Sequence, residues 1–471
     1  MGGKYQISTL GDTCYITDGA HAKVERQPTG VMYLTSKNVG EGRLTLDNVD
    51  YISEEDYDRL FATSSRSQRR LVEGDVLTGI IGTFGTVYRY RKEDKFGISS
   101  AVAILRPNPD LLDSEYLSYV LQSPGFKAVH NSYKSGSVQG YTNIATLKIL
   151  PIPVPPLKDQ KKIAQNLSIF DKKIEINSQT NDTLEAMAQA LFKSWFVDFD
   201  PVIDNALAAG NDIPEPFKVR AAARQALGDK RKPLSEEIRR EFPDGFEFMD
   251  GAGWVPKGWE VVDTESITKK IAMGPFGSNI KVDTFVDSGI PIINGQHLRR
   301  SLLNDAEYRF IAEEHALKLK NSMVKRGDIV FTHRGNIGQV SLIPVRSKFE
   351  DYVISQSQLY IRPDVEKICS TYLLHYFRSN IGQHSLLSNA SQVGVPSISR
   401  ASTHLKKIRL ILPKLLITKT FDRFSLGIYD RIVENENQAE VLASIRDTLL
   451  PKLLSGELTI PDAEKLAVEA L

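Results

Sequence analysis

The strongest constraint on this chain is that its sequence repeats itself. Short groups of residues from its first part return, in the same order, more than 250 positions later. The pairs are Gly74-Asp75-Val76 with Gly327-Asp328-Ile329, Ile98-Ser99 with Ile354-Ser355, Arg106-Pro107 with Arg362-Pro363, and Tyr116-Leu117 with Tyr372-Leu373. The offset drifts from 253 to 256 positions, as small loop insertions would produce between two diverged copies. Because 471 residues exceed one hydrophobic core, we predict two domains of the same fold.

Each copy has the pattern of a mixed α and β domain. Short apolar runs at residues 98–105 and 358–361 are typical of strands, and glycine-rich turns separate them from their neighbours. Helical stretches follow around residues 114–121 and 371–377, and prolines then end each copy. The predicted fold class is α+β, with two mixed α/β domains in tandem repeat.

After each copy, seam residues recur with alternating spacings of four and three. The first seam comprises Ile163, Leu167, Phe170, Ile174, Asn177, Asn181, Leu184, Ala188, Leu191 and Trp195. Adding 258 gives the second, Phe421, Ser425, Ile428, Ile432, Asn435, Ala439, Leu442, Arg446, Leu449 and Leu453. A regular seam of about 35 residues exceeds the usual helix length of about 11–12 residues, which favours coiled-coil helices over ordinary core helices.

If these helices pair antiparallel, a pseudo-twofold axis relates the two copies and suits a DNA site with two separated halves. Asn177 and Asn435 are equivalent and central, so we expect them to face each other and fix the register.

The predicted organisation has six parts. They are a first domain at residues 1–157, a first long helix at 158–200, a charged linker at 201–253, a second domain at 254–412, a second long helix at 413–455 and a C-terminal tail at 456–471. The linker has some helical character between Ala206 and Leu227, and nothing in it suggests chemistry.

Charge and composition narrow the class of function. The net charge is +1, but residues 254–412 carry 21 Lys and Arg against 14 Asp and Glu, whereas residues 1–157 carry 17 of each. The second domain is therefore a candidate phosphate-binding surface. No apolar run approaches the roughly 20 residues of a membrane span. Cys14 and Cys369 are too few for a disulfide framework or a zinc cluster, so we expect a cytoplasmic protein.

The sequence offers no catalytic or metal-binding motif. It has no Gly-x-x-x-x-Gly-Lys phosphate loop, no Cys-x-x-Cys pair and no Asn-Pro-Pro or Asp-Pro-Pro motif of an adenine methyltransferase. The glycines at 82–85 and 274–277 lack the third glycine of a dinucleotide fingerprint and predict tight turns. We therefore expect no catalytic residue, no metal ligand and no cofactor in this chain, which disfavours a self-contained nuclease–methyltransferase.

Three segments, together with the tandem layout, resemble the specificity subunits of type I restriction–modification systems. The segments are residues 191–199 (LFKSWFVDF), 253–261 (GWVPKGWEV) and 449–457 (LLPKLLSGE), and the resemblance covers the whole chain. It implies that each copy is a target recognition domain that reads one half of a bipartite sequence in double-stranded DNA. It also implies that the long helices act as a spacer and dock two methyltransferase subunits, which bring S-adenosylmethionine. Restriction and translocase subunits would bring ATP and Mg.

The candidate DNA contacts are polar and basic side chains on matched loops, because such side chains bind phosphates and base edges. In the first domain they are Thr35, Ser36, Lys37, Asn38, Arg66, Arg69, Arg70, Lys134, Ser135, Gln139 and Tyr141. In the second they are Asn294, Gln296, His297, Arg299, Arg334, Asn336, Ser391 and Gln392, with Arg300 and His333 beside them. Loops that match in position and differ in identity suit two domains that read different half-sites.

Two other interpretations stay open at this point. The chain could be the recognition subunit of a related methylation or defence system that does not cut DNA, or a coiled-coil scaffold with two protein-binding heads. Salt-dependent, sequence-specific DNA binding would separate recognition from scaffolding.

Overall fold

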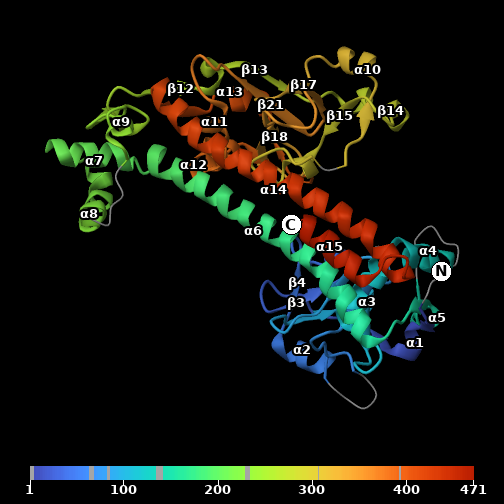
Figure 1. Ribbon diagram of the computed structural model, residues 1–471. Coiled ribbons are helices and arrows are strands. Elements are labelled where there is room, and N and C mark those ends of the chain that lie inside the picture. Colours follow the sequence, from blue (N-terminus) through green and yellow to red (C-terminus); the bar gives the residue numbers. More distant parts are fainter. Residues whose placement is uncertain are drawn as a thin grey trace. The chain divides into compact units, whose positions relative to one another are not determined.

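The computed structural model describes residues 5–62, 68–81, 85–133, 142–228, 234–305, 307–391 and 394–470. The chain divides into two compact units (Figure 1). Unit 1 comprises residues 1–177 with 437–471, and unit 2 comprises residues 178–436. Each unit therefore contains one repeat domain and about half of each long helix, and the end of the chain belongs to the same unit as its beginning.

The first domain is built on two sheets. The antiparallel four-stranded sheet has the order β2-β8-β5-β6, formed by Cys14–Asp18, Val102–Pro107, Val76–Gly79 and Val87–Arg89. The three-stranded sheet has the order β4-β3-β7, formed by Asp50–Ile52, Val31–Leu34 and Phe96–Ile98. In it, β3 pairs antiparallel with β4 and parallel with β7. A separate pair, β1 (Ile7–Thr9) with β9 (Pro151–Pro153), joins the two ends of the domain.

The second domain repeats this topology and extends the smaller sheet by one strand at each edge. Its four-stranded sheet has the order β13-β21-β18-β19, formed by Thr268–Met273, Gln358–Pro363, Ile329–Thr332 and Val340–Leu342. Its other sheet has the order β14-β16-β15-β20-β17, formed by Phe285–Val286, Phe310–Ile311, Ile290–Ile293, Asp351–Ile354 and Met323–Lys325. The pair β12 (Glu260–Asp263) with β24 (Arg409–Leu412) joins the ends. The predicted tandem repeat of mixed domains is therefore confirmed.

Most short helices of the first domain have a counterpart in the second. The first domain has α1 (Leu10–Thr13), α2 (Glu54–Leu60), α3 (Ser114–Gln122), α4 (Pro124–Ser132) and α5 (Ile144–Ile149). The second has α10 (Glu313–Lys318), α11 (Ser370–Arg378), α12 (Asn380–Leu387) and α13 (Ala401–Lys406). Ser123 and Ser379, which lie 256 positions apart, cap α4 and α12 in the same way, because each hydroxyl accepts a backbone N–H of the first turn at 3.2 Å.

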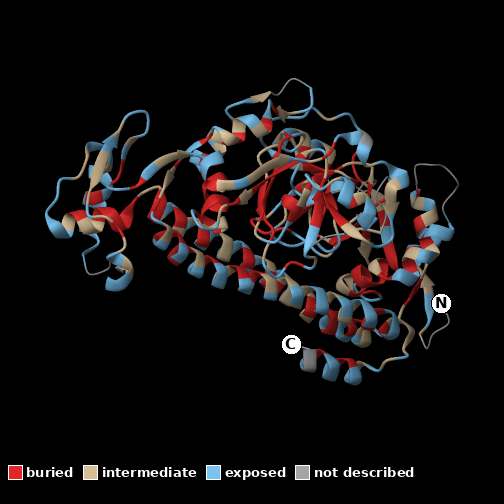
Figure 2. Cartoon of the chain, turned by 90° about the horizontal axis from the view of Figure 1, so that it is seen from above, coloured by how far each residue is buried: buried red, intermediate tan, exposed pale blue. Residues whose placement is uncertain are grey.

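The two long helices are α6 (Leu157–Phe196) and α14 (Leu415–Ser455). Each buries one face and exposes the other (Figure 2), and every seam residue predicted from the spacing is buried or half-buried. In unit 1, Leu167 packs in one core cluster with Leu442 and Leu449. In unit 2, Leu184 packs in one cluster with Ile428 and Ile432. The seam therefore belongs to the core of both units.

Polar bonds across the seam show that the helices run antiparallel within each unit. In unit 1, Asp171 pairs with Arg446, and Asn177 Nδ2 donates to Gln438 Oε1 at 2.9 Å. In unit 2, Asn435 Nδ2 donates to Asn181 Oδ1 at 2.7 Å. The expected approach of Asn177 to Asn435, which belong to different units, stays a prediction.

The segment predicted as a charged linker folds as part of unit 2. It contains α7 (Asp200–Ala209), α8 (Lys218–Ala226), α9 (Glu236–Arg239) and a hairpin of β10 (Phe246–Met249) with β11 (Gly253–Pro256). Its charges pair internally, because the buried Asp200 carboxylate binds Arg220 at 2.7 Å and Arg224 at 3.2 Å. The predicted C-terminal tail contains a helix, α15 (Ile460–Ala470), whose Ala463 and Ala467 pack in the core of unit 1.

Candidate nucleic-acid interface

The residues that repeat between the domains hold the sheets together. In the first domain, Arg106 Nε and Nη2 each donate to the buried Asp75 carboxylate at 2.7 Å. In the second, Arg362 makes the same two-pronged bond to Asp328, at 2.8 and 2.6 Å. These hydrogen bonds raise the pKa of both guanidinium groups. The repeated Asp and Arg therefore tie the second strand of each four-stranded sheet to the third.

A second repeated bond fixes each domain to the strand that leaves it. Tyr116 Oη donates to the carbonyl of Pro153 at 3.0 Å, and Tyr372 Oη donates to the carbonyl of Ile411 at 2.5 Å. Both rings are buried, so a phenol that lost this acceptor would leave a polar atom in the core. The repeated tyrosines have the same structural task in both copies.

Backbone bonds also gather the loops that carry the candidate contacts. Ser99 N donates to Leu34 O in the first domain, and Ser355 N donates to Ile293 O in the second. A further matched pair joins Thr142 N to Ile80 O and Ile398 N to His333 O. Loops that are distant in sequence are therefore held together identically in the two domains, while the side chains on them differ.

Gly30 and Gly289 mark the place where this packing is tightest. Their φ angles are +140° and +150°, and a Cβ on either would lie 2.3 Å from the carbonyl oxygen of Ile52 or Ile311. No other residue fits there without moving the neighbouring strand. The glycines repeat because each lets a loop-bearing strand approach the neighbouring strand of its sheet closely.

Most candidate contacts of the second domain lie at its surface. Gln296, Arg299, Arg334 and Asn336 are exposed, and Asn294 and Ser391 are half-buried. The Arg334 loop reaches the segment that contains Ser391, because Gly335 N donates to Pro396 O at 2.8 Å. Arg300 instead binds α6 through Ser178 and Asp182, which makes it a support of the helix contact.

The first domain exposes fewer of its candidates. Lys37 is exposed, Thr35 is half-buried and Ser36 is buried. Arg69 binds the carbonyl and carboxylate of Asp18, at 3.1 and 3.4 Å. Arg70 is exposed and lies with its guanidinium carbon 5.3 Å from the centre of the Tyr57 ring.

Two candidates have structural roles that the sequence did not reveal. Asn38 is buried, accepts the backbone N–H of Thr35 at 2.9 Å and donates to two loop carbonyls. His297 occupies the equivalent position, accepts the N–H of Asn294 at 3.0 Å and stacks on Tyr308 at 4.4 Å. Burial lowers the pKa of His297, which favours the neutral ring that accepts this bond. Both side chains are therefore occupied in holding the backbone of their own loops and are not candidates for DNA contact.

His333 is likewise a support. It is buried, its Nε2 lies 3.2 Å from the carbonyl of Gln356, and burial lowers its pKa. The remaining candidates lie outside the described residues; they are Arg66, Lys134, Ser135, Gln139, Tyr141 and Gln392.

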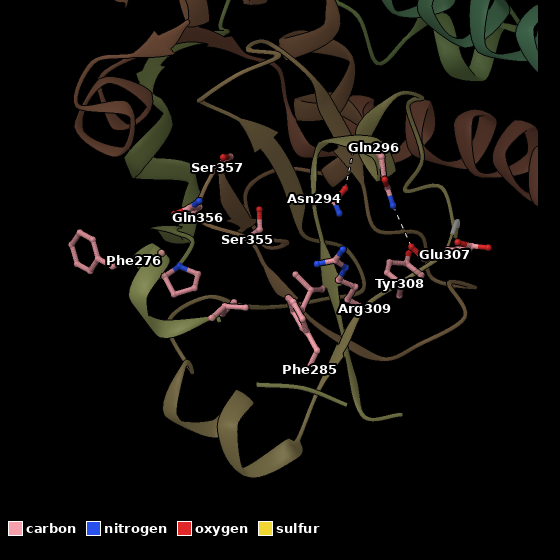
Figure 3. Close-up of a pocket in the computed structure, with 14 residues that line it drawn as sticks. Phe276, Phe285, Asn294, Gln296, Glu307, Tyr308, Arg309, Ser355, Gln356 and Ser357 are labelled. Atoms are coloured by element: carbon pink, nitrogen blue, oxygen red, sulfur yellow. Dashed lines mark hydrogen bonds between the residues drawn. The ribbon is translucent and has the colours of Figure 1, made fainter. Parts of the chain in front are cut away.

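Sequence reasoning missed a hollow of about 490 Å³ beside the second domain's candidate contacts. Figure 3 shows the Arg309 side chain below Asn294 and above Phe285, with Ser355 and Gln356 to the left of it. Phe276 stands at the rim and is 85% exposed. A phenylalanine set between the two glycines of a predicted turn was the available signal for this site.

Other classes of site find no support in the described part of the chain. No group of three or more His, Cys, Asp or Glu residues there could hold a metal ion. Among the same residues, no helix is long and apolar enough to cross a membrane. Cys14 is buried, and burial raises its pKa to about 12, which disfavours a reactive thiolate.

Comparison with known proteins identifies the class to which this arrangement belongs. The model of a family described as "Type I restriction modification DNA specificity domain" matches residues 3–186 and 256–440. Each matched segment contains most of one repeat domain and part of the long helix after it. The class is that of non-catalytic DNA-recognition components. The chain belongs to the family of type I restriction–modification specificity subunits.

Individual relatives are distant but match over most of their length. The specificity subunit of the type I restriction enzyme HindI of Haemophilus influenzae is 27% identical over 418 residues, which are 83% of this chain and 88% of that protein. The MjaIX specificity subunit of Methanocaldococcus jannaschii is 27% identical over 356 residues, 74% of this chain and 70% of that protein. The crystal structure of an S subunit from M. genitalium aligns at 14% identity over 96% of both chains, with a TM-score of 0.46.

Proposed function

We propose that each domain reads one half of a bipartite DNA target, and that the paired helices dock methyltransferase subunits. The observation that carries this proposal is the pair of identical supports under different loops. The same Asp–Arg pair, buried tyrosine and backbone bonds recur in both domains. The exposed side chains on the matched loops differ, as they would in two readers of different half-sites.

The exposed chemistry of the second domain supports contact with DNA. Gln296 and Asn336 can form bidentate bonds to adenine, and Arg334 can bind guanine or a phosphate. The surplus of Lys and Arg over Asp and Glu between residues 254 and 412 adds a favourable field for the duplex. Binding of the assembled complex should therefore weaken steeply as salt rises, which a protein-binding scaffold would not show for DNA.

The long helices offer a surface for partner subunits. Their outer faces expose several large apolar side chains, including Ile176 and Met187 on α6 and Phe424 and Val441 on α14, all between 45% and 58% exposed. These side chains are available for apolar contacts with partner subunits. The docked methyltransferases would supply S-adenosylmethionine and flip the target adenine into their own active sites. Restriction subunits, with ATP and Mg, would join through them.

Methylation mapping tests the proposal directly. We expect cells that carry this gene with its neighbouring methyltransferase gene to methylate adenines in one sequence of two short parts, separated by a fixed number of unread bases. The purified chain alone should transfer no methyl groups, and addition of the methyltransferase should restore the reaction. A single contiguous target, or methyl transfer by the isolated chain, would contradict the proposal.

A further inference from the structure

The hollow of the second domain contains a cation that the first domain neutralises at the matching place. Arg309 precedes β16, and its guanidinium carbon lies 5.0 Å from the centre of the Phe285 ring. Among the described residues, no carboxylate pairs with Arg309, and its side chain is exposed. The positive charge is therefore available to a ligand that enters the hollow.

The strand register identifies the equivalent positions in the first domain. Val286 pairs with Phe310 in the second domain, and Gln27 pairs with Tyr51 in the first, so both members are 259 positions apart. Phe285 and Arg309 therefore correspond to Arg26 and Asp50. In the first domain, these two side chains form an ion pair, with Arg26 Nε 2.8 Å from an Asp50 carboxylate oxygen. At this place the first domain therefore has a neutralised ion pair, whereas the second has an unpaired positive charge among the described residues.

The chemistry around Arg309 favours a base over a phosphate as its partner. Among the described residues that line the hollow, Arg309 alone is basic and Glu307 alone is acidic, whereas the others carry amides, hydroxyls and apolar groups. Asn294, Gln296 and Gln356 present amide groups, which pair with base edges. A phosphate site would be expected to gather several cations or backbone N–H groups instead.

The Phe285 ring prepares Arg309 for this task. A guanidinium held over an aromatic face keeps its planar fork of N–H groups directed sideways, and that fork matches the O6 and N7 acceptors of guanine. The hollow also adjoins the reading loops, because Ser355 N is bonded to Ile293 O beside Asn294. A duplex that contacts Asn294 and Gln296 would therefore bring base edges to Arg309.

We propose that this hollow is a base-reading subsite of the second domain and that Arg309, held over Phe285, recognises a guanine in that domain's half-site. The inference rests on the proposed function and adds a residue and a base to it. The first domain, where Arg26 and Asp50 neutralise each other, has no such reading group at the matching place.

The test compares methylation by complexes that contain the full chain with Arg309→Ala or Arg309→Lys. We expect both variants to lose roughly 10- to 100-fold discrimination at one guanine of the second half-site, since a good bidentate base contact contributes about 1–3 kcal/mol. Lysine keeps the positive charge but lacks the planar pair of N–H donors that guanine requires, so Arg309→Lys should not restore discrimination. The first half-site should be unchanged, and so should the salt dependence of binding.

Arg346→Ala is the matched control. Arg346 lies in the same domain, its side chain is 70% exposed, and it pairs with Asp430 on α14. Its removal should leave both half-sites as they are. Unchanged discrimination in both Arg309 variants would overturn the inference. A uniform loss of binding to all sequences, with a shallower salt slope that lysine restores, would also overturn it and identify a phosphate contact. Failure of the proposed function is a separate result, because the unaltered chain would then show no two-part target.

Discussion

The two repeat domains carry the same ion pair at one place and opposite arrangements at another. Each domain has a buried carboxylate that accepts two hydrogen bonds from one guanidinium group. The pairs are Asp75 with Arg106 and Asp328 with Arg362. At the hollow, by contrast, one domain pairs Arg26 with Asp50 and the other leaves Arg309 available above a phenylalanine ring. Residues retained in both copies support the sheets, whereas the side chains at the hollow, where we propose that a base is read, have diverged.

The two domains also differ in the side chains that join them to the long helices. In unit 1, Tyr119 Oη donates to Asp171 of α6. In unit 2, His375 and Tyr429 occupy the matching positions, 256 and 258 residues later, and His375 Nε2 lies 2.7 Å from Tyr429 Oη. The other ring nitrogen of His375 lies 2.7 Å from Gln189 Oε1 of α6. One junction is therefore charged and the other neutral, although both place a side chain of the domain against a long helix.

The largest predicted effect concerns the shared ion pairs. Asp75→Asn and Asp328→Asn should each lower the free energy of unfolding by about 3–5 kcal/mol, because a half-buried guanidinium loses its buried carboxylate partner. Urea unfolding of the two variants measures this loss. The exposed Asp58, which binds Arg70 at 3.3 Å, provides the control, and Asp58→Asn should change stability little. A large loss in only one of the two domains would show that the pairs are not equivalent supports.

A second prediction concerns the pH dependence of stability, which should differ between the Tyr119 contact of unit 1 and the His375 contact of unit 2. Burial lowers the pKa of His375 to about 3, with repulsion from Arg378 as the smaller cause. The unfolded chain binds a proton near pH 6.5 that the folded chain excludes, so stability from this residue is present above pH 6.5 and is lost as pH falls towards 3. Between pH 7.5 and 5 we expect a loss of about 2 kcal/mol.

Thermal unfolding as a function of pH checks this prediction. His375→Gln should be less stable at pH 7.5, yet it should lose less stability than the unaltered chain between pH 7.5 and 5. Tyr119 in unit 1 has no titration in this range, because burial raises its pKa further above 10. Parallel pH profiles for the variant and the unaltered chain would contradict the assigned role of His375.

A smaller effect is expected at the centre of the helix pair. Replacement of both Asn181 and Asn435 by leucine should raise the free energy of unfolding by about 1 kcal/mol, because two buried amides give way to apolar packing. The register should loosen at the same time, since the bond between their side chains is lost. Urea unfolding reports the first effect, and methylation of targets with additional spacer lengths reports the second. A destabilised variant with an unchanged spacer would refute the register role.

The smallest effect should follow a change in helix length. Four residues inserted between Gln179 and Thr180 lengthen α6 by about 6 Å and restore the seam after nearly one turn. At about 3.4 Å per base pair, the unread spacer should grow by about one base pair and by two at most, with the same bases read on each side. Insertion of two residues rotates the rest of the helix by about 200° and should abolish activity. An unchanged spacer with full activity would mean that the helices measure nothing.

The sequence predicted the parts of the fold that depend on repetition and periodicity. Gly74-Asp75 and Arg106 could be matched to their second copies because an ion pair tolerates few replacements, and the seam was readable because apolar spacing encodes a helix face. The hydrogen bond from Asn435 to Asn181 was not readable in this way. Asn177, Asn181 and Asn435 all occupy seam positions, and the spacing alone does not say which side chains bond.

The candidate site was harder to predict because the same residue types cap loops and read bases. Asn38 and His297 have the hydrogen-bonding groups that DNA contacts require, and the structure uses those groups to hold backbone N–H groups from below. Arg309 was not predicted, because nothing in its own sequence position marks it as a contact. Its importance depends on Phe285 and on the absence of the aspartate that occupies the matching position in the first domain. Neither relation is visible until the strands are paired.

Replacement of one whole domain is the decisive test of whether the two domains read their half-sites independently. Residues 254–412 would be exchanged for the corresponding region of a relative with a different target, and methylation would be mapped with the same methyltransferase. The supports are the same in both domains and each lies within its own copy, so we expect one half of the target to change to the donor's sequence. The other half and the spacer should stay as they are. A change in both halves together would contradict independent reading by two repeated domains.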